Sequence, residues 1–225
     1  MKSWLMRYVL KSVRSPAAGG AGLVSDNASE AGPGAPGRTV TREEINKLPL
    51  YRYRGPVHVV SRDDQLNAAI RAMRREKILG FDTESRPAFK KGESHPVSVV
   101  QLAGSKAVYV FQLSGLTQTQ QLFGLLASKK CLKVGVALAY DVRKLQELRD
   151  FTPGGFTDLE ALTDERGIKN NGLRSLAAAV LGVRISKGAQ RSNWARTPLT
   201  PKQVSYAATD AWVSREIYLA LQGMA

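Results

Sequence analysis

The stretch Ile78-Leu-Gly-Phe-Asp-Thr-Glu84 places two carboxylates at the end of an apolar run, and the run itself predicts a buried strand. Side chains two positions apart on a strand share a face, so Asp82 and Glu84 are expected to point the same way. Phe81 and Thr83 should point the other way. Neighbouring carboxylates repel each other unless a cation neutralises them, and hard divalent ions prefer such oxygen ligands. Alternatively, both carboxylates face solvent beyond the strand.

Two later positions extend this acidic set. Asp141 follows an apolar run at 133–140, which predicts a strand passing into a helix. Its carboxylate is therefore expected near the C-terminal end of a strand, where open α/β sheets bind ligands, although a lone aspartate there can equally cap a helix. Tyr206 and Asp210 lie four apart on the last predicted helix and so share a face. A phenol in such a place can orient or deprotonate a water, or form a simple surface pair. Small neighbours should let this helix approach the sheet closely: Ala207, Ala208 and Ala211.

The surrounding pattern predicts an α/β domain with a mixed sheet, because early hairpin strands are followed by alternating strands and helices. Capping boxes beginning at Thr41 and Thr200 indicate the starts of the first and last helices. The expected strands are 57–60, 78–84, 97–103, 107–112 and 131–138. The expected helices are 41–48, 64–73, 117–128, 140–149, 173–181 and 200–222.

The charge of the chain indicates its class of partner. Lys and Arg number 33 against 19 Asp and Glu, giving a net charge of +14 and a pI near 10.1. Such an excess favours a polyanion, either nucleic acid or an anionic membrane surface. No apolar stretch approaches the ~20 residues of a membrane span, so no insertion into a membrane is expected. The single cysteine, Cys131, excludes an internal disulfide and is compatible with a reducing compartment such as the cytoplasm.

Residues 1–40 differ from the rest of the chain. They are basic at first and then rich in Ala, Gly, Pro and Ser, as in Gly32-Pro-Gly-Ala-Pro-Gly37. This composition predicts a disordered segment, with an organelle-targeting peptide as the less favoured interpretation. Residues 41–225 are predicted to form one folded domain.

The motifs, taken together, resemble a known family. Phe81-Asp-Thr-Glu84, the Val134-Gly-Val region leading to Asp141, and Tyr206-x-x-x-Asp210 resemble, in order, the three motifs of the DEDD exonucleases. The segment 192–200 is similar to the Trp-x-x-Arg-Pro-Leu-Thr segment of ribonuclease D and Werner-type exonucleases, except that Thr197 separates Arg from Pro. The resemblance spans about residues 48–221.

This resemblance implies a ribonuclease H-like α/β fold with a five-stranded mixed sheet flanked by helices. It implies the tyrosine subclass, because Tyr206 stands four before the last aspartate and the histidine position holds Ser205. The implied activity is 3′–5′ exonuclease hydrolysis of DNA or RNA, acting on a single-stranded 3′ end and releasing nucleoside 5′-monophosphates. Tyr206 would bind the attacking water. The implied ligands of two Mg²⁺ or Mn²⁺ ions are Asp82, Glu84, Asp141 and Asp210.

Further residues are expected to bind the strand. The expected phosphate contacts are Lys187, Arg191 and Arg196, which can equally form a solvated basic loop. Phe89 would stack on the terminal base or pack locally, and Gln101 and Leu102 would line the nucleotide pocket. Two other functions remain open at this point: a catalytically silent nucleic-acid-binding module of the same fold, and a phosphodiesterase acting on short oligonucleotides. The oligomeric state is not predicted.

Overall fold

A computed structural model describes residues 39–223 of the chain. The segment expected to be disordered, residues 1–40, therefore lies almost wholly outside the described residues. Among the described residues, no helix combines the length and the apolar composition that a membrane crossing requires.

The described residues form a mixed sheet of six strands in the order β1-β4-β3-β2-β5-β6. β3 is antiparallel to both β2 and β4, and the remaining pairs are parallel. The strands are β1 (Val57–Val60), β2 (Ile78–Ser85), β3 (Val97–Ala103), β4 (Val108–Gln112), β5 (Leu132–Gly135) and β6 (Phe156–Asp158). The five predicted strands are present. The expected count of five is wrong, because β6 adds an edge strand of three residues, too short to show an alternating pattern.

The predicted helices lie at the expected positions in the chain, but several of them differ in length from the prediction. Both capping boxes are confirmed: Thr41 caps α2, and Thr200 and Gln203 exchange hydrogen bonds at the start of α8. α6 was not predicted. The helices are α2 (Arg42–Lys47), α3 (Asp63–Met73), α4 (Gln120–Leu126), α5 (Leu138–Leu148), α6 (Leu159–Asp164), α7 (Leu173–Leu181) and α8 (Pro201–Gly223), with a 3₁₀ turn η1 (Leu113–Gly115).

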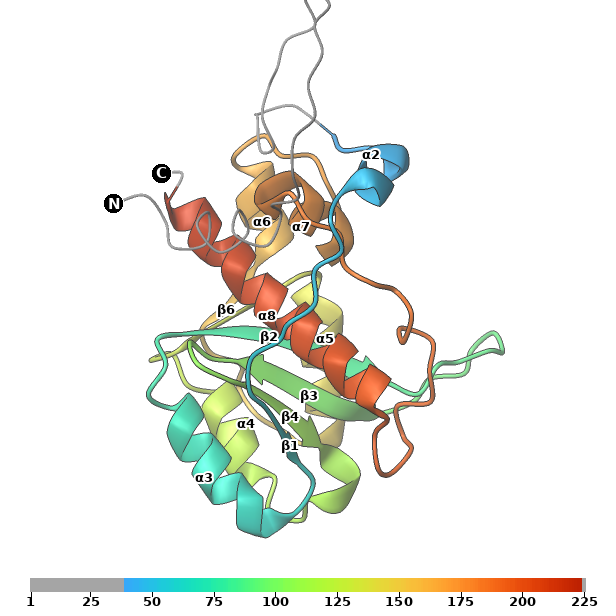
Figure 1. Cartoon of the computed structure of the whole chain (residues 1–225). Helices are drawn as coiled ribbons and strands as arrows, with labels where there is room; N and C mark the ends of the chain where they lie inside the picture. Colours follow the sequence, from blue (N-terminus) through green and yellow to red (C-terminus); the bar gives the residue numbers. More distant parts are fainter. Residues whose placement is uncertain (1–38, 224–225) are drawn as a thin grey trace, which may run out of the picture. The chain divides into compact units, whose positions relative to one another are not determined.

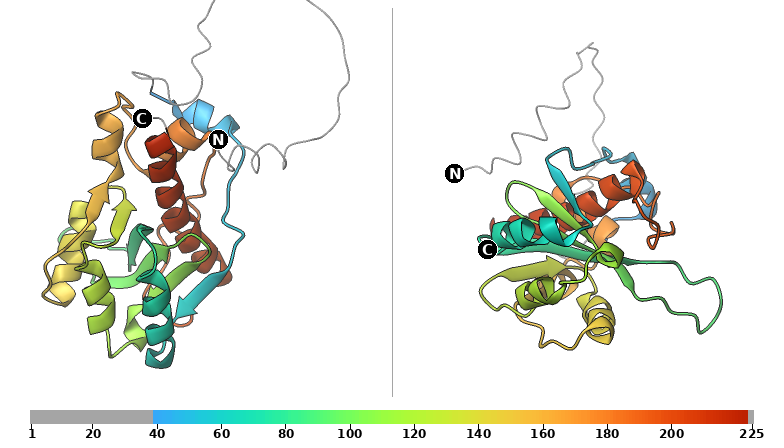
Figure 2. Two further views of the ribbon diagram at one scale, coloured as in Figure 1. Left: turned by 90° about the vertical axis from the view of Figure 1, so that its left-hand side faces the viewer. Right: turned by 90° about the horizontal axis from the view of Figure 1, so that it is seen from below.

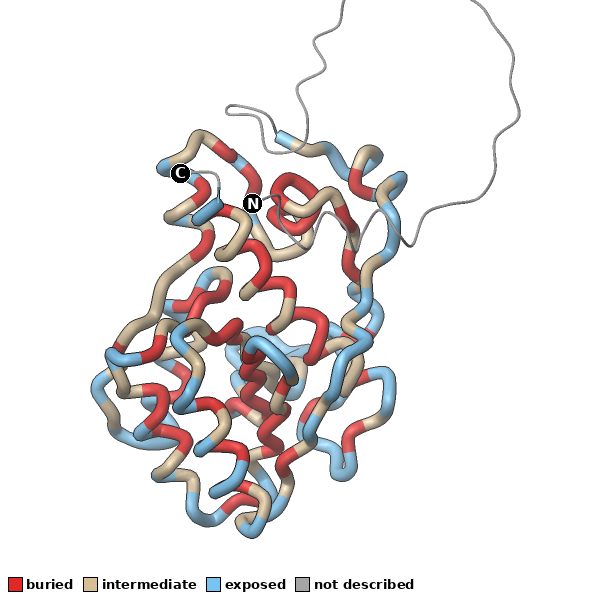
Figure 3. The backbone as a smooth tube through the Cα atoms, turned by 60° about the vertical axis from the view of Figure 1, so that its left-hand side comes forward, coloured by how far each residue is buried: buried red, intermediate tan, exposed pale blue. Residues whose placement is uncertain are grey.

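Helices cover both faces of the sheet (Figure 1). On one face, Phe81 and Leu102 belong to a core built with α3, α4 and α5. On the other face, α8 crosses the strands, and α7 packs against its C-terminal half (Figure 2). Figure 3 shows the buried residues concentrated along the strands and the inner sides of these helices. The core therefore consists of two layers, one on each side of the sheet.

α8 lies unusually close to β2. A Cβ built on Gly80 would stand 1.8 Å from the carbonyl oxygen of Ala211, so only glycine fits there. Three alanines of α8, at positions 207, 208 and 211, are fully buried against the sheet, which confirms the predicted close approach. This packing brings Asp210 of α8 to the strand that carries Asp82.

Candidate active site

Three carboxylates from two elements meet at one place. Asp82 and Glu84 point to the same face of β2, and Asp210 reaches them from α8. One oxygen from each of the three lies within 4.8 Å of the others. Strand alternation explains the pairing of the first two, and the contact between α8 and β2 supplies the third.

Burial and mutual repulsion disfavour ionisation of this cluster. Burial, followed by the charges of Asp210 and Asp141, raises the pKa of Asp82 well above its usual value. The pKa of Glu84 rises to about 10, because of burial first and of the three aspartates second. Burial raises the pKa of Asp210 to about 7, although a hydrogen bond from Tyr206 opposes this shift. The site therefore concentrates negative charge at a considerable electrostatic cost.

The donor set fits hard divalent cations. Oδ1 of Asp210 is buried and accepts no hydrogen bond. In the part of the chain that the structure describes, no lysine, arginine or histidine forms a salt bridge with the three carboxylates. Mg²⁺, Mn²⁺ and Ca²⁺ bind carboxylate oxygens of this kind, which are not already paired with a basic side chain.

Tyr206 lies one helical turn before Asp210 and is hydrogen-bonded to its carboxyl group. Burial raises the pKa of Tyr206, and the charges of Asp210 and Glu84 raise it further. Bound cations would offset the effect of these charges but not the effect of burial, the largest cause. The phenol therefore remains protonated, which suits it to orient a water rather than to accept a proton.

Asp141 lies outside the three-carboxylate group. It is in the first turn of α5, on the other side of β2, where its Oδ1 accepts a hydrogen bond from the hydroxyl of Thr83. Its charge nevertheless raises the pKa of both Asp82 and Glu84, so it is close to the cluster. The structure thus joins three of the four predicted ligands directly and holds the fourth beside them.

A cavity of about 330 Å³ opens over the cluster. Its wall includes Tyr206 and Lys187, one of the predicted phosphate contacts. It also includes Asn171 and Arg174, from the turn that leads into α7, which the sequence did not indicate. Arg174 belongs to no recognised motif, and the residues around it predict only the beginning of a helix.

The other predicted contacts lie around this cavity rather than in its wall. The guanidinium of Arg191 stands 5.6 Å from the ring centre of Phe89, and that ring is 72% exposed. The 85–96 loop thereby meets the segment before α8. Arg196 is exposed, and its Nε donates to the carbonyl of Pro198 at 3.1 Å.

The structure places two of the residues predicted for the pocket wall outside the lining of this cavity. Leu102 pairs with Phe81 and is fully buried in the core on the face away from α8, so it cannot touch a nucleotide there. Gln101 pairs with Asp82 on the correct side but is also fully buried, and it does not border the cavity. Its amide oxygen and nitrogen have no hydrogen-bond partner.

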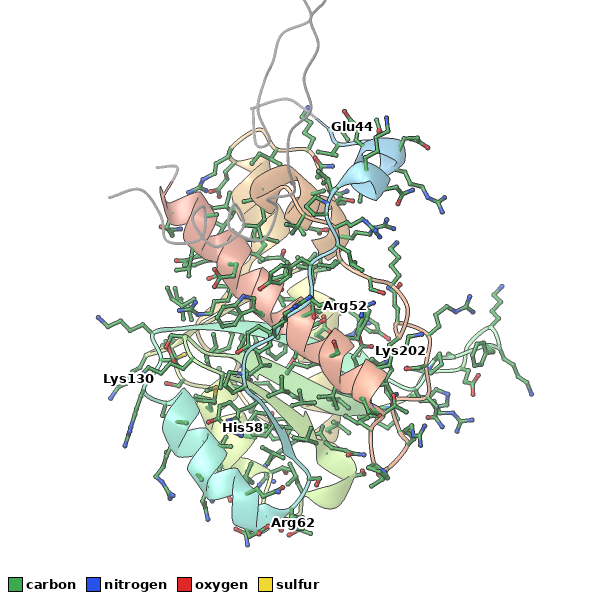
Figure 4. All side chains as sticks on the ribbon, in the orientation of Figure 1. Glu44, Arg52, His58, Arg62, Lys130 and Lys202 are labelled. Carbon is green, nitrogen blue, oxygen red and sulfur yellow. The ribbon has the colours of Figure 1, made fainter. Side chains whose placement is uncertain are left out.

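A second cavity, of about 310 Å³, shares Tyr206 and Asp210 with the first. Tyr51, Arg52 and Lys202 line it. Figure 4 shows Arg52 on the segment that crosses α8 and Lys202 at the beginning of that helix. Basic side chains therefore border the carboxylate cluster on this side as well.

A mixed sheet that carries a cluster of acidic metal-ligand candidates, with basic side chains around it, is the arrangement that the exonuclease motifs of the sequence imply. The chain belongs to the 3′–5′ exonuclease family, whose sequence model matches residues 57–225. Family membership and the ribonuclease H-like fold implied by the motifs are confirmed.

The relatives agree with this family. Mouse bifunctional 3′–5′ exonuclease/ATP-dependent helicase WRN is 36% identical over 152 residues, which cover 64% of this chain and 11% of that protein. Human exonuclease 3′–5′ domain-containing protein 2 is 32% identical over 173 residues, covering 71% of this chain and 28% of that protein. The chain thus spans only a minor part of the length of these relatives.

Solved structures show the same fold. The EXO domain of Aedes aegypti Nibbler superposes with a TM-score of 0.70 at 25% identity, covering 77% of this chain and 91% of that domain. Escherichia coli RNase D superposes with a TM-score of 0.64 at 21% identity, covering 74% of this chain and 45% of that structure.

Proposed function

We propose that this chain is a 3′–5′ exonuclease that removes nucleotides one at a time from the free 3′ end of a DNA or RNA strand. The products are nucleoside 5′-monophosphates, and the cofactors are two Mg²⁺ or Mn²⁺ ions. One observation carries the proposal: half-buried Asp82 and Glu84 and buried Asp210 converge within 4.8 Å in a chain of the exonuclease family, and no cationic side chain of residues 39–223 forms a salt bridge with them.

Asp82, Glu84 and Asp210 would hold the cations, with Asp141 as the fourth ligand. Oδ1 of Asp141 accepts a hydrogen bond from Thr83, and its Oδ2 would contact a cation directly or through a water. When bound, two divalent cations supply Lewis acidity, which favours hydroxide near neutral pH and offsets charge on the phosphate and the leaving oxygen.

Tyr206 would orient the attacking water. Its phenol is partly buried next to Asp210 and remains protonated, so it can hold a water by hydrogen bonding in line with the scissile phosphate. Lys187 in the cavity wall would bind a phosphate oxygen, and this contact gives affinity without sequence preference.

A single strand fits the surroundings of the cavity. The exposed ring of Phe89, with Arg191 over it, offers a face on which a terminal base can stack. Arg196 would contact a phosphate farther along the strand. These contacts are independent of base identity and are expected to weaken as salt concentration rises.

The test is a gel assay with 5′-labelled single-stranded DNA, single-stranded RNA and the corresponding duplexes. With Mg²⁺ or Mn²⁺ we expect ladders shortened one nucleotide at a time, and with EDTA no cleavage. A 3′-labelled strand should release labelled mononucleotide at once. Binding without cleavage in both metals would instead support the silent binding module, and faster cleavage of dinucleotides than of strands of about 20 nucleotides would support an oligonucleotide phosphodiesterase.

A further inference from the structure

Arg174 lines the cavity over the carboxylates without an ionic partner of its own. Its Nε is buried and has no hydrogen-bond partner. Its Nη2 donates to Oδ1 of Asn46, in α2, at 2.5 Å. Among the described residues, no carboxylate forms a salt bridge with it. The guanidinium is thus held by a neutral group, and among residues 39–223 no carboxylate neutralises it.

Helix stability does not explain this arginine. Arg174 stands in the first turn of α7, where the helix macrodipole disfavours a cation. A structural arginine at such a position would normally pair with an acidic side chain, as Arg62 does with Asp64 at 2.9 Å. A cation that lines the same cavity as three carboxylates and is held by an asparagine is better suited to an anionic ligand that enters the cavity.

The segment that holds Arg174 lies upstream of the family match, which begins at residue 57. Main-chain and side-chain hydrogen bonds fix this segment at both ends. Val40 exchanges two hydrogen bonds with the amide of Asn170, at 3.3 and 3.4 Å. Farther along, Tyr51 N donates to the carbonyl of Arg184 at 2.8 Å. α2 therefore lies against the beginning of α7 (Figure 1, Figure 2) with Asn46 in a defined place.

We propose that Arg174, positioned by Asn46, binds a backbone phosphate of the substrate strand next to the scissile one. The proposal rests on the exonuclease function above and adds to it a binding residue and the element that orients it. The carboxylates repel the strand, so a fixed guanidinium in the same wall helps to hold a phosphate close to them. A guanidinium binds two phosphate oxygens at once in a defined orientation, which a lysine does not.

The first test is binding in EDTA, so that no cleavage occurs. The affinity of the full chain for a 5′-fluorescein single strand of about 20 nucleotides is measured by anisotropy at several salt concentrations. We expect Arg174→Ala to weaken binding about tenfold. It should also reduce the slope of log affinity against log salt by about 0.7, the value for one phosphate contact to a single strand. Arg174→Lys should recover only part of the affinity.

Arg71→Ala is the matched control. Arg71 is an exposed arginine of α3, on the face of the sheet away from α8, so the variant loses the same charge far from the cavity. It should change affinity less than about twofold. If the Arg71 and Arg174 variants lost the same affinity, the effect would come from net charge alone, and the proposal would be overturned.

A double-mutant cycle tests the role of Asn46. Asn46→Ala should weaken binding severalfold when Arg174 is present and leave it unchanged in the Arg174→Ala background. Equal effects in both backgrounds would show that Asn46 does not act through Arg174. Thermal unfolding of each variant checks that the fold is retained.

Cleavage kinetics separate this inference from the proposed function. If the wild type cleaves, Arg174→Ala should raise KM about tenfold with kcat nearly unchanged, as expected for a pure binding contact. If the wild type binds but does not cleave, the exonuclease proposal fails while the binding measurements still decide the role of Arg174. Wild-type affinity and salt slope in Arg174→Ala would overturn the inference in either case.

Discussion

At the scale of single residues, the acidic cluster lowers the stability of the metal-free fold and provides the candidate metal ligands. Three carboxylates, one buried and two half-buried, repel one another, and no cationic side chain of the described residues forms a salt bridge with them. Removing one negative charge should therefore stabilise the metal-free protein while destroying the site for the metal. This opposite behaviour of stability and activity distinguishes a metal site from a structural cluster.

Asp210→Asn is expected to abolish cleavage and to raise the melting temperature in EDTA. The amide keeps the shape of the side chain and removes its repulsion with Asp82 and Glu84. Each kcal/mol gained should appear as a shift of about 2–4 °C in calorimetry. Asp150→Asn, at an exposed position, is the control and should change neither property. Metal-dependent cleavage by Asp210→Asn at the wild-type rate would refute the ligand assignment.

Tyr206→Phe is expected to lower kcat by about 10²–10³ while leaving divalent-metal binding intact. The hydroxyl orients water in our assignment but does not hold the cations, so only the chemical step should suffer. Single-turnover cleavage and metal titration by calorimetry measure the two effects separately. Unchanged kcat would remove Tyr206 from the reaction, and lost metal binding would reassign it to the metal site.

The residue scale also shows what the sequence could and could not reveal. The acidic positions were recognisable because their spacing on a strand and a helix encodes a shared face. Arg174 carried no such signal, since its importance comes from a cavity formed by turns distant in sequence. Leu102 and Gln101 share the pocket prediction, yet one step along a strand reverses the direction of a side chain, so only Gln101 is on the side of Asp82.

At the scale of elements, the contact between α8 and β2 sets the geometry of the site. Asp82 lies on β2 and Asp210 on α8, and the two residues are far apart in the sequence. Their separation therefore depends on how closely the helix packs on the strand. Gly80 is the point of closest approach.

Gly80→Ala should push α8 away from β2, because the new Cβ would overlap the carbonyl oxygen of Ala211 at 1.8 Å. We expect a loss of about 1–3 kcal/mol in the free energy of unfolding, measured by urea denaturation. The loss of kcat should exceed what partial unfolding explains, because Asp210 moves with the helix.

Gly124→Ala is the matched control for Gly80→Ala. Gly124 lies in α4, where the nearest atom to a new Cβ is Arg74 Nη2 at 3.7 Å. Higher helix propensity should raise stability by up to about 1 kcal/mol without affecting cleavage. If Gly80→Ala behaved in the same way, the close approach of α8 would not control the site.

Elements marked by a capping box or by an apolar pattern were predictable, and short ones without such a signal were not. The capping boxes and apolar stripes gave the positions of α2 and α8. β6 and α6 together span only residues 156–164, so neither contains enough residues to show a period. The predicted strand 131–138 was also too long: β5 ends at Gly135, and α5 begins at Leu138. Of the two residues between them, Val136 packs on the core and Ala137 is exposed with φ 56°, and a hydrophobic pattern cannot distinguish these from strand residues.

At the scale of the whole molecule, two electrostatic patterns oppose each other. The chain carries a net charge of +14, yet its candidate active site gathers carboxylates in one buried place. The positive surface attracts a polyanion from a distance, and the acidic centre rejects its phosphates unless divalent cations are bound. Binding of the strand and binding of the metal should therefore favour each other.

The same opposition predicts how stability depends on pH. The folded-state pKa values of Asp210, about 7, and Glu84, about 10, lie above those of ordinary carboxyl groups. Between the ordinary values and these, the folded state binds more protons than the unfolded state, so the metal-free protein loses stability as pH rises. Divalent cations replace the protons, and their stabilising effect should grow with pH.

Thermal unfolding with saturating Mn²⁺ or with EDTA, at pH values of about 5.5 and 8, measures this dependence. We expect the difference in melting temperature between Mn²⁺ and EDTA to be small at the lower pH and several degrees larger at the higher pH. In Asp210→Asn the pH dependence of that difference should shrink, because one of the titrating groups is gone. A metal effect that is independent of pH in the wild type would show that the cations bind elsewhere than at the buried carboxylates.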